Sequence, residues 1–97
     1  MSAISFTWDP NKNSTNILKH GISFEEAKSV FRDEYARLMH DPDHSEDEER
    51  FLILGFSKKN NILVVCHCYR ENDEVVRIIT ARKATKNEKK EYQEFKL

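Results

Sequence analysis

The chain has 97 residues, of which 38% are hydrophobic and 34% charged, and its formal net charge is -1. This length is enough for one compact domain, which we expect over residues 1–97, and too short for two. No apolar run reaches the roughly 20 residues that a membrane helix needs, and the N-terminus lacks the basic start and apolar core of a secretion signal. We therefore expect a cytoplasmic protein without a membrane contact.

Acidic and basic residues are distributed unevenly along the chain. Six acidic residues and no lysine or arginine lie between positions 41 and 49, whereas residues 77–97 contain seven basic and three acidic residues. This asymmetry allows one surface to attract an anionic polymer although the whole chain is almost neutral. Charge alone does not distinguish such a surface from an ordinary solvated helix.

The beginning of the chain predicts a short strand followed by a helix. Apolar and small polar residues alternate over positions 4–8, as they do in a half-buried strand. An acidic N-cap and a proline at the first helical position then open a helix over residues 10–20, which ends at Gly21. We expect its inward face to carry Ile17 and Leu18.

A second helix is predicted over residues 24–32. Ser23 and Glu26 have the spacing of a capping box, in which each side chain bonds the backbone N–H of the other residue. Apolar residues then recur at helical spacing, namely Phe24, Ala27, Val30 and Phe31. The two helices follow each other closely, so we expect both on the same face of a sheet.

The rest of the chain predicts four strands and a short helix. The strands are expected over residues 36–40, 51–56, 62–69 and 75–82, with polar turns between them. Thr85 and Glu88 have a second capping-box spacing, which opens a C-terminal helix. Short turns require consecutive strands to be antiparallel. The order β-α-α-β-β-β-β-α therefore predicts an α+β fold: a twisted antiparallel sheet with two N-terminal helices packed on one face and a short C-terminal helix.

Alternation along residues 62–69 divides their side chains between the two faces of the sheet. One set is apolar and contains Ile62, Val64, Cys66 and Cys68. The other set contains Leu63, Val65, His67 and Tyr69. We expect the purely apolar set to meet the helices. The histidine and the tyrosine would then lie on the open face, where we expect the chemistry.

The sequence contains no convincing metal or cofactor motif. Asp41, Asp43 and Ser45 have the spacing that opens a calcium loop, but Glu46 occupies the position where that loop needs glycine. The two cysteines that flank His67 cannot join it around one zinc ion, because a strand directs its middle residue to the opposite face. A glycine-rich phosphate loop is also missing. We therefore expect neither a metal nor another cofactor.

The remaining polar residues are of the types that cleave RNA without a metal. The ribose 2′-OH is the nucleophile in that reaction, so the protein supplies a base, an acid and cations for the pentavalent phosphate. Arg77 and Arg82 share a predicted strand, where a guanidinium group can bind phosphate through two hydrogen bonds. His67 is expected on the neighbouring strand, and Glu49 and Arg50 open the strand beyond it. Taken singly, each of these residues is more typical of a structural or surface role, and only the cluster as a whole suggests catalysis.

Three segments together resemble one known protein family. The first contains Phe6-Thr-Trp-Asp-Pro10, Lys12, Asn16 and Lys19-His-Gly-Ile-Ser-Phe-Glu-Glu-Ala27. The second contains Glu48-Glu-Arg-Phe51 and Gly55-Phe-Ser57, and the third contains Arg77-Ile-Ile-Thr-Ala-Arg-Lys-Ala84, Glu88 and Tyr92. This pattern, which extends from residue 6 to about residue 92, is similar to that of the BrnT family of bacterial toxins.

The resemblance implies a RelE-like fold and a ribonuclease that inhibits translation and growth until its antitoxin binds. The partner would be a BrnA-like antitoxin, a ribbon-helix-helix DNA-binding protein, and the complex with it a heterotetramer. The matched motifs contain the candidate catalytic residues Glu49, Arg50, Arg77, Arg82 and Tyr92. His67 lies outside these motifs and is a catalytic candidate on strand geometry alone. The candidate RNA-binding residues are Lys12, Lys83 and Lys86.

Two other functions are compatible with the sequence. The chain could be a module that binds RNA or protein without catalysis, and the acidic residues 41–49, which would repel RNA, favour this alternative. It could also be a structural interaction protein whose basic C-terminal helix is a docking surface. RNA degradation by the purified chain distinguishes both from a ribonuclease.

Overall fold

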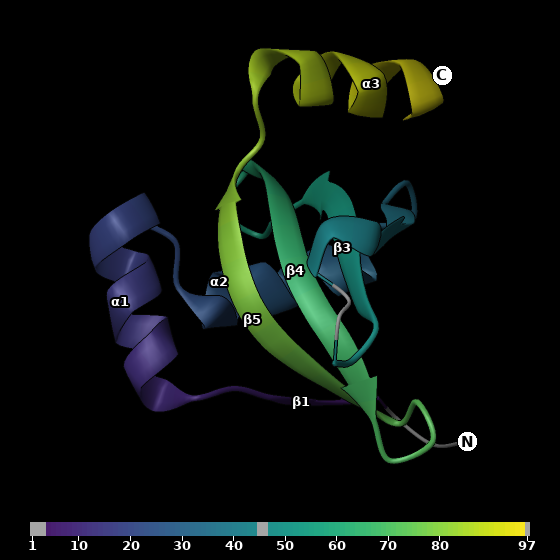
Figure 1. Ribbon diagram of the computed structural model, residues 1–97. Coiled ribbons are helices and arrows are strands. Elements are labelled where there is room, and N and C mark those ends of the chain that lie inside the picture. The colour runs from purple at the N-terminus through teal and green to yellow at the C-terminus, as the bar shows by residue number, and fades with distance from the viewer. Residues whose placement is uncertain (1–3, 45–46, 97) are drawn as a thin grey trace.

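The computed structural model of the protein describes residues 4–44 and 47–96. Its helices and strands follow the predicted order, and the ends of the strands differ from the predicted ones by at most one residue (Figure 1). The second predicted helix is α-helical only as far as Ser29 and continues to Arg32 as a 3-10 helix. They are β1 (Ser5–Thr7), α1 (Pro10–His20), α2 (Phe24–Ser29), the 3-10 helix η1 (Val30–Arg32), β2 (Arg37–Asp41), the 3-10 helix η2 (Pro42–His44), β3 (Arg50–Phe56), β4 (Ile62–Arg70), β5 (Val75–Lys83) and α3 (Lys86–Lys96). No helix in these residues is long and apolar enough to cross a membrane.

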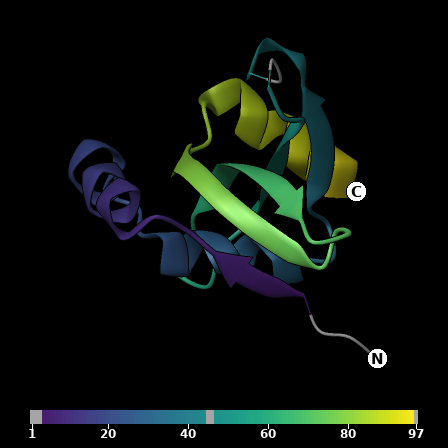
Figure 2. The same cartoon turned by 60° about the horizontal axis from the view of Figure 1, so that its bottom comes forward.

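The five strands form one mixed sheet with the order β1-β5-β4-β3-β2. Strands β2 to β5 are an antiparallel meander, as predicted from their short turns. Strand β1 instead runs parallel to β5 at the edge of the sheet, with Ser5 opposite Val75 and Thr7 opposite Arg77 (Figure 2). The prediction of a wholly antiparallel sheet is therefore wrong at this strand. The short-turn argument applies only to consecutive strands, and β1 and β5 are separated by most of the chain.

Helices α2 and η1 cover one face of the sheet, and we call it the helix-covered face. The main core lies there and contains Ile22, Phe24, Ala27, Val30, Ile53, Leu63, Val65, Val76, Ile78 and Ala81. From β4, this core takes Leu63 and Val65, whereas Val64, Cys66 and Cys68 pack in two smaller clusters. The predicted orientation of β4 is therefore reversed. Alternation identified correctly which side chains share a face, but both sets are largely apolar, so polarity did not show which set the helices cover.

Helix α1 is attached to the sheet through a polar residue. The predicted inward residues Ile17 and Leu18 are 44% and 89% exposed, whereas Asn16 is 5% exposed. The Asn16 amide donates to the carbonyl oxygens of Ile22 at 2.9 Å and Ala81 at 2.8 Å, and its Oδ1 accepts from the Ala81 N–H at 3.1 Å. Strand β1 pairs with β5 only as far as Arg77. Asn16 thus bonds the backbone of β5 beyond the end of β1 and holds α1 beside that edge.

Helix α2 is fastened to the turn between β3 and β4 by a buried carboxylate. The Glu26 N–H donates to Ser23 Oγ at 3.0 Å, as in the predicted capping box. The Glu26 carboxylate does not complete the box, however, because Oε2 accepts from Ser57 Oγ at 2.6 Å and from Asn61 Nδ2 at 2.8 Å. Glu26 is 2% exposed, so two donors from a distant turn satisfy an oxygen that would otherwise be costly to bury.

Candidate functional site

Helix α3 covers one end of the opposite face of the sheet. Tyr92 is 2% exposed and packs with Leu54, Val64 and Ala84. Its hydroxyl donates to Asp33 Oδ2 at 2.6 Å. Burial, followed by this bond to a carboxylate, raises the pKa of Tyr92. Tyr92 therefore anchors α3 on the sheet, and the remainder of this face, which we call the open face, is left uncovered.

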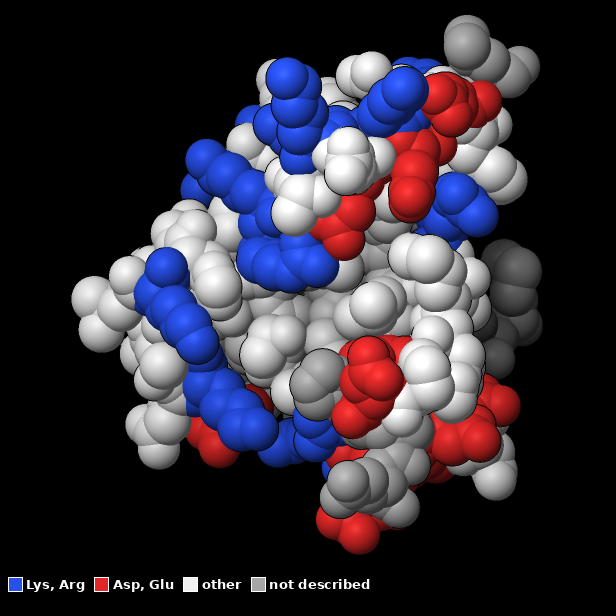
Figure 3. Space-filling view, turned by 45° about the horizontal axis from the view of Figure 1, so that its top comes forward, with Lys and Arg blue, Asp and Glu red and all other residues white. Residues whose placement is uncertain are grey.

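The open face contains a hollow of about 350 Å³, which we call the arginine hollow. Its lining residues come from five elements and are Asp41, Asp43, Arg50, Leu52, Val64, Cys66, Ile79, Thr80 and Arg82. The middle of the lining is apolar and the ends are polar. Figure 3 shows a hollowed, largely uncharged surface with lysine and arginine side chains on the sides where α1 and α3 lie. A ligand in this hollow would meet apolar atoms and the two arginines, and the lining also contains the carboxylates of Asp41 and Asp43.

A β-bulge shapes one wall of the arginine hollow. The pairing of β4 with β5 shifts so that Cys66 lies opposite Thr80 and His67 lies opposite Ile78, which leaves Ile79 as the extra residue. A bulge locally changes the direction of side chains. Ile79 and Thr80 therefore both line the hollow although they are adjacent in sequence. Thr80 adds a hydroxyl group beside Arg82 that sequence analysis did not single out.

Arg82 is held by the first turn of α3. Its Nη1 and Nη2 donate to Glu88 Oε1 and Oε2 at 2.8 and 3.0 Å. Glu88 also completes the predicted capping box, because Oε1 accepts from the Thr85 N–H at 2.8 Å and the Glu88 N–H donates to Thr85 Oγ1 at 3.2 Å. The hydrogen bonds from Arg82 are the main cause that lowers the pKa of Glu88 to about 2. A guanidinium group that binds a carboxylate through both nitrogens has the geometry that also suits phosphate.

Three further arginines belong to the open face. Arg50 lines the hollow, and its Nη2 lies 3.8 Å from Glu48 Oε1. Arg70 Nη2 donates to Glu48 Oε2 at 3.0 Å, so one carboxylate connects β3 to β4. Arg77 lies opposite Cys68 in the sheet, and cross-strand partners share a face. Arg70 was not among the predicted site residues. Its two-residue spacing from Cys68 would have placed it on the face expected to meet the helices, because the orientation of β4 was predicted in reverse.

His67 is in the core and not at the site. Its side chain has 0% exposure and contacts Phe31 edge-on, with ring centroids 4.8 Å apart. Nδ1 lies 3.1 Å from the Val65 carbonyl oxygen, which can only accept, so Nδ1 carries the proton. Nε2 then accepts from the Tyr69 hydroxyl at 3.3 Å. Burial lowers the pKa of His67, and the predicted position on an open face is wrong because a neutral, fully bonded imidazole packs well among aromatic rings.

Glu49 lies away from Arg50 and the arginine hollow. It lines a different hollow together with Phe51 and Tyr69, which are residues of the helix-covered side. Because consecutive residues of an extended chain point to opposite faces, Glu49 and Arg50 do not act on one ligand.

The three predicted RNA-binding lysines occupy different places. Lys12 lies on α1 and lines a groove with Ile79 and Thr80. Lys83 is exposed but lies opposite Leu63, a residue of the helix-covered core, so it points away from Arg82. Lys86 is exposed on the first turn of α3. Of the predicted site residues, the structure therefore brings Arg50 and Arg82 together, with Arg77 on the same face and Lys12 beside it.

Among the described residues, no three His, Cys, Asp or Glu side chains are grouped so that they could hold a metal ion. The polar groups that the open face offers to a ligand are guanidinium and hydroxyl groups, with Asp41 and Asp43 at one end of the hollow. Of these, the guanidinium and hydroxyl groups bind phosphate directly, whereas the two carboxylates repel it.

The chain is similar to known proteins in both its sequence and its fold. Residues 8–88 match the model of a family described as the ribonuclease toxin BrnT of type II toxin–antitoxin systems. The structure is similar to the 1.1 Å crystal structure of the Brucella abortus ribonuclease toxin BrnT, with a TM-score of 0.62 and 25% identity over 89% of this chain and 100% of that chain. A search of curated proteins for similar sequences finds no match. The family match and the fold both confirm the resemblance seen in the sequence: this chain belongs to the BrnT family of ribonuclease toxins, whose type II systems pair a toxin that acts on RNA with an antitoxin.

Proposed function

We propose that this chain is an endoribonuclease that needs no metal ion, acts in the cytoplasm, and inhibits translation and growth until its cognate antitoxin binds. The observation that supports the proposal most directly is that Arg50 and Arg82 line one hollow. Arg70 and Arg77 lie on the same face. Fixed guanidinium groups can supply the positive charge that a metal ion provides in other nucleases.

In this proposal the substrate provides the nucleophile. The 2′-OH of a ribose attacks the adjacent phosphorus and gives its proton to a water molecule, so that a 2′,3′-cyclic phosphate forms. The 5′-oxygen of the next nucleotide leaves and takes up a proton from water. Arg50 and Arg82 bind the nonbridging oxygens, whose negative charge grows as the pentavalent phosphate forms. The RNA phosphate competes with the Glu88 carboxylate for Arg82, because both anions use the same two nitrogens. Glu49, His67 and Tyr92 are left out, because Glu49 faces another hollow and the other two are buried.

Substitution of Arg82 tests its assigned role. We expect Arg82→Ala to lower the cleavage rate at saturating RNA by about 10²–10³-fold, the effect typical of losing one group that stabilises transition-state charge. Glu88→Gln is the matched control, since it removes the same ion pair but keeps the cation. Equal losses in both variants would assign the effect to the docking of α3, and full activity in folded Arg82→Ala would contradict the proposed site.

Chelation tests independence from a metal ion. We expect the cleavage rate to be unchanged after dialysis against EDTA, because the proposed charge stabilisation comes from guanidinium groups. Loss of activity that a divalent cation restores would contradict this part of the proposal. Binding of RNA without any cleavage would instead favour the non-catalytic module.

The antitoxin is proposed to be a dimeric, BrnA-like, ribbon-helix-helix protein that forms a heterotetramer with two toxin chains. The family supports an antitoxin as partner, since its toxins belong to type II toxin–antitoxin systems. We expect growth arrest when the chain is expressed alone and normal growth when the neighbouring gene is co-expressed. Native mass spectrometry of the complex would measure its stoichiometry, and normal growth with the chain present alone at high level would contradict the toxin role.

A further inference from the structure

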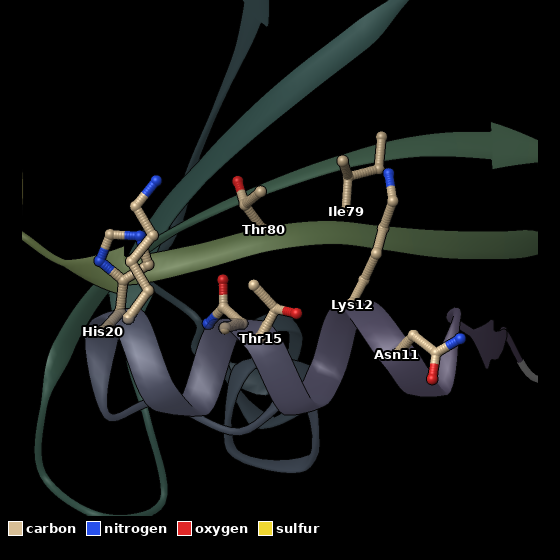
Figure 4. A pocket seen from close by; sticks show the side chains of 8 residues that line it. Asn11, Lys12, Thr15, His20, Ile79 and Thr80 are labelled. Atoms are coloured by element: carbon tan, nitrogen blue, oxygen red, sulfur yellow. The ribbon is translucent and has the colours of Figure 1, made fainter.

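A second depression adjoins the arginine hollow, between α1 and β5. We call it the α1 groove (Figure 4). It encloses about 290 Å³, and α1 contributes Lys12, Thr15, Lys19 and His20 to its lining. Ile79 and Thr80 of β5 form its other side. In Figure 4, Lys12 extends from α1 towards Ile79, and Thr15 lies between Lys12 and His20 along the helix, facing Thr80.

The α1 groove and the arginine hollow form one continuous surface. Ile79 and Thr80 line both of them, because the bulge in β5 brings both side chains to the open side. Asn16 keeps α1 at this place by its three hydrogen bonds, two of which go to the backbone of Ala81. A ligand that extends beyond the arginine hollow across Thr80 therefore enters the α1 groove.

The charges of the α1 groove suit an anionic strand. Helix α1 carries Lys12, Lys19 and His20 and contains no acidic residue, in contrast to α2 and α3. Lys12 and Lys19 are seven residues apart, so they lie on the same side of the helix and about 10 Å apart along its axis. Lysine ammonium groups at such spacing can each bind a different phosphate of an extended chain. The Thr15 hydroxyl lies between them, and the groove also contains the Asn11 amide and the His20 imidazole, which offer hydrogen bonds to a ribose or a base.

We propose that the α1 groove binds the single-stranded RNA that flanks the scissile phosphate, with Lys12 and Lys19 on two backbone phosphates. The proposal rests on the proposed cleavage at the arginine hollow, from which the same strand would continue. RNA is favoured over a protein segment because the groove joins the arginines without a break and carries no acidic side chain.

The test compares two double variants that change net charge equally. Lys12→Gln with Lys19→Gln alters the groove, and Lys28→Gln with Lys58→Gln alters exposed or half-exposed lysines near a different pocket. The first readout is the affinity for a ten-nucleotide single strand with 2′-deoxy substitution, which cannot be cleaved, measured by fluorescence anisotropy at several salt concentrations. We expect the groove variant to reduce the slope of log affinity against log salt by about 1.4, since each lost phosphate contact on a single strand contributes about 0.7. The control variant should keep the native slope.

The second readout is cleavage of a ten-nucleotide RNA and of a dinucleotide, which is too short to occupy both sites. We expect the groove variant to raise KM for the longer RNA with kcat unchanged, and to cleave the dinucleotide as the native protein does. The binding readout needs no catalysis, so an inactive native protein would overturn the proposed cleavage and leave the groove testable. An unchanged slope, or an equal change in both double variants, would overturn the groove proposal. So would native RNA affinity combined with weakened antitoxin binding, because the groove would then belong to the antitoxin.

Discussion

Polar side chains are buried on the helix-covered face of the sheet and partly exposed on the open face. On the helix-covered face, His67 and Glu26 are 0% and 2% exposed, and their hydrogen-bonding atoms are matched with partners inside the protein. On the open face, Arg82 and Glu88 bond each other while their side chains remain 41% and 27% exposed. The hydrogen bonds of a buried network are complete without a ligand, whereas a ligand can replace one partner of an exposed ion pair. A polar residue therefore points to a function only when its hydrogen-bonding groups still face a space that a ligand can enter.

The largest loss of stability is expected from a substitution in the core of the helix-covered face. Phe24 has 0% exposure and contacts Trp8 edge-on, with ring centroids 6.1 Å apart. We expect Phe24→Ala to lower the free energy of unfolding by about 3–5 kcal/mol, a large part of the total for so small a domain. Urea denaturation measures this loss. Leu18→Ala is the control: at 89% exposure it should change stability by less than about 0.5 kcal/mol, and a large loss there would contradict the orientation of α1.

The next largest loss of stability is expected when the buried carboxylate of Glu26 is removed. Glu26→Ala would leave the Ser57 hydroxyl and the Asn61 amide without their acceptor, so we expect a loss of about 2–3 kcal/mol in the free energy of unfolding. Glu25→Ala is a matched control from the same turn of α2. Glu25 forms only an exposed pair with Lys28, so its removal should cost about 0.5 kcal/mol or less. Similar losses in both variants would show that the network does not hold α2 to the β3–β4 turn.

Interactions between residues that are close in the sequence could be predicted, whereas those between residues far apart in the sequence could not. Asp9, Gly21 and the pair Thr85–Glu88 end or begin helices as predicted, because their partners lie within a few residues. The partners of Glu26 and Asn16 lie on other elements, so their buried roles could not be deduced from neighbouring residues.

The residues of the candidate site were predicted only in part. Arg50 and Arg82 were predicted because the family motifs contain both, and the structure places them in one hollow. The strand pattern indicated that Glu49 and Arg50 face opposite ways, and it could have excluded Glu49. Thr80 lies two residues before Arg82, so alternation along the strand could have placed it on the same face. The positions of Ile79 and Arg77 on this face depend on a bulge in the pairing of β4 with β5, which has no signature in the sequence of either strand.

Near neutral pH, the free energy of unfolding should depend on pH through His67 of the helix-covered face. Burial lowers the pKa of His67, so the unfolded chain binds a proton at this residue more readily than the folded chain does. The stabilising effect of the neutral imidazole is therefore complete above pH of about 6.5 and decreases below it, by at most about 1.4 kcal/mol per pH unit. His67→Phe should show a weaker decrease between pH 7 and pH 5.5 in denaturation experiments. An identical decrease in both proteins would mean that His67 is not held neutral.

The smallest change in stability is expected at acidic pH, where the ion pair between Arg82 and Glu88 on the open face is lost. The pKa of Glu88 is lowered to about 2, so its ion pair with Arg82 stabilises the fold fully above pH of about 4.5 and loses this effect as the pH falls towards 2. Because both side chains are partly exposed, we expect about 1 kcal/mol from this pair. Glu88→Gln should remove that part of the acid dependence in thermal unfolding at low salt. If the variant retained the native acid dependence, the pair would not contribute measurably to stability.

The parallel strand β1 has a consequence for how the chain reaches its fold. Each pairing within β2 to β5 joins segments that are consecutive in sequence, whereas Ser5 meets Val75 only after nearly the whole chain has been arranged. Closing such a long loop has an entropic cost that the local hairpins avoid. The meander can therefore form its contacts early in folding, with β1 joining β5 late. In pulse-labelling experiments, amide protons of β4 should become protected from exchange before those of β1.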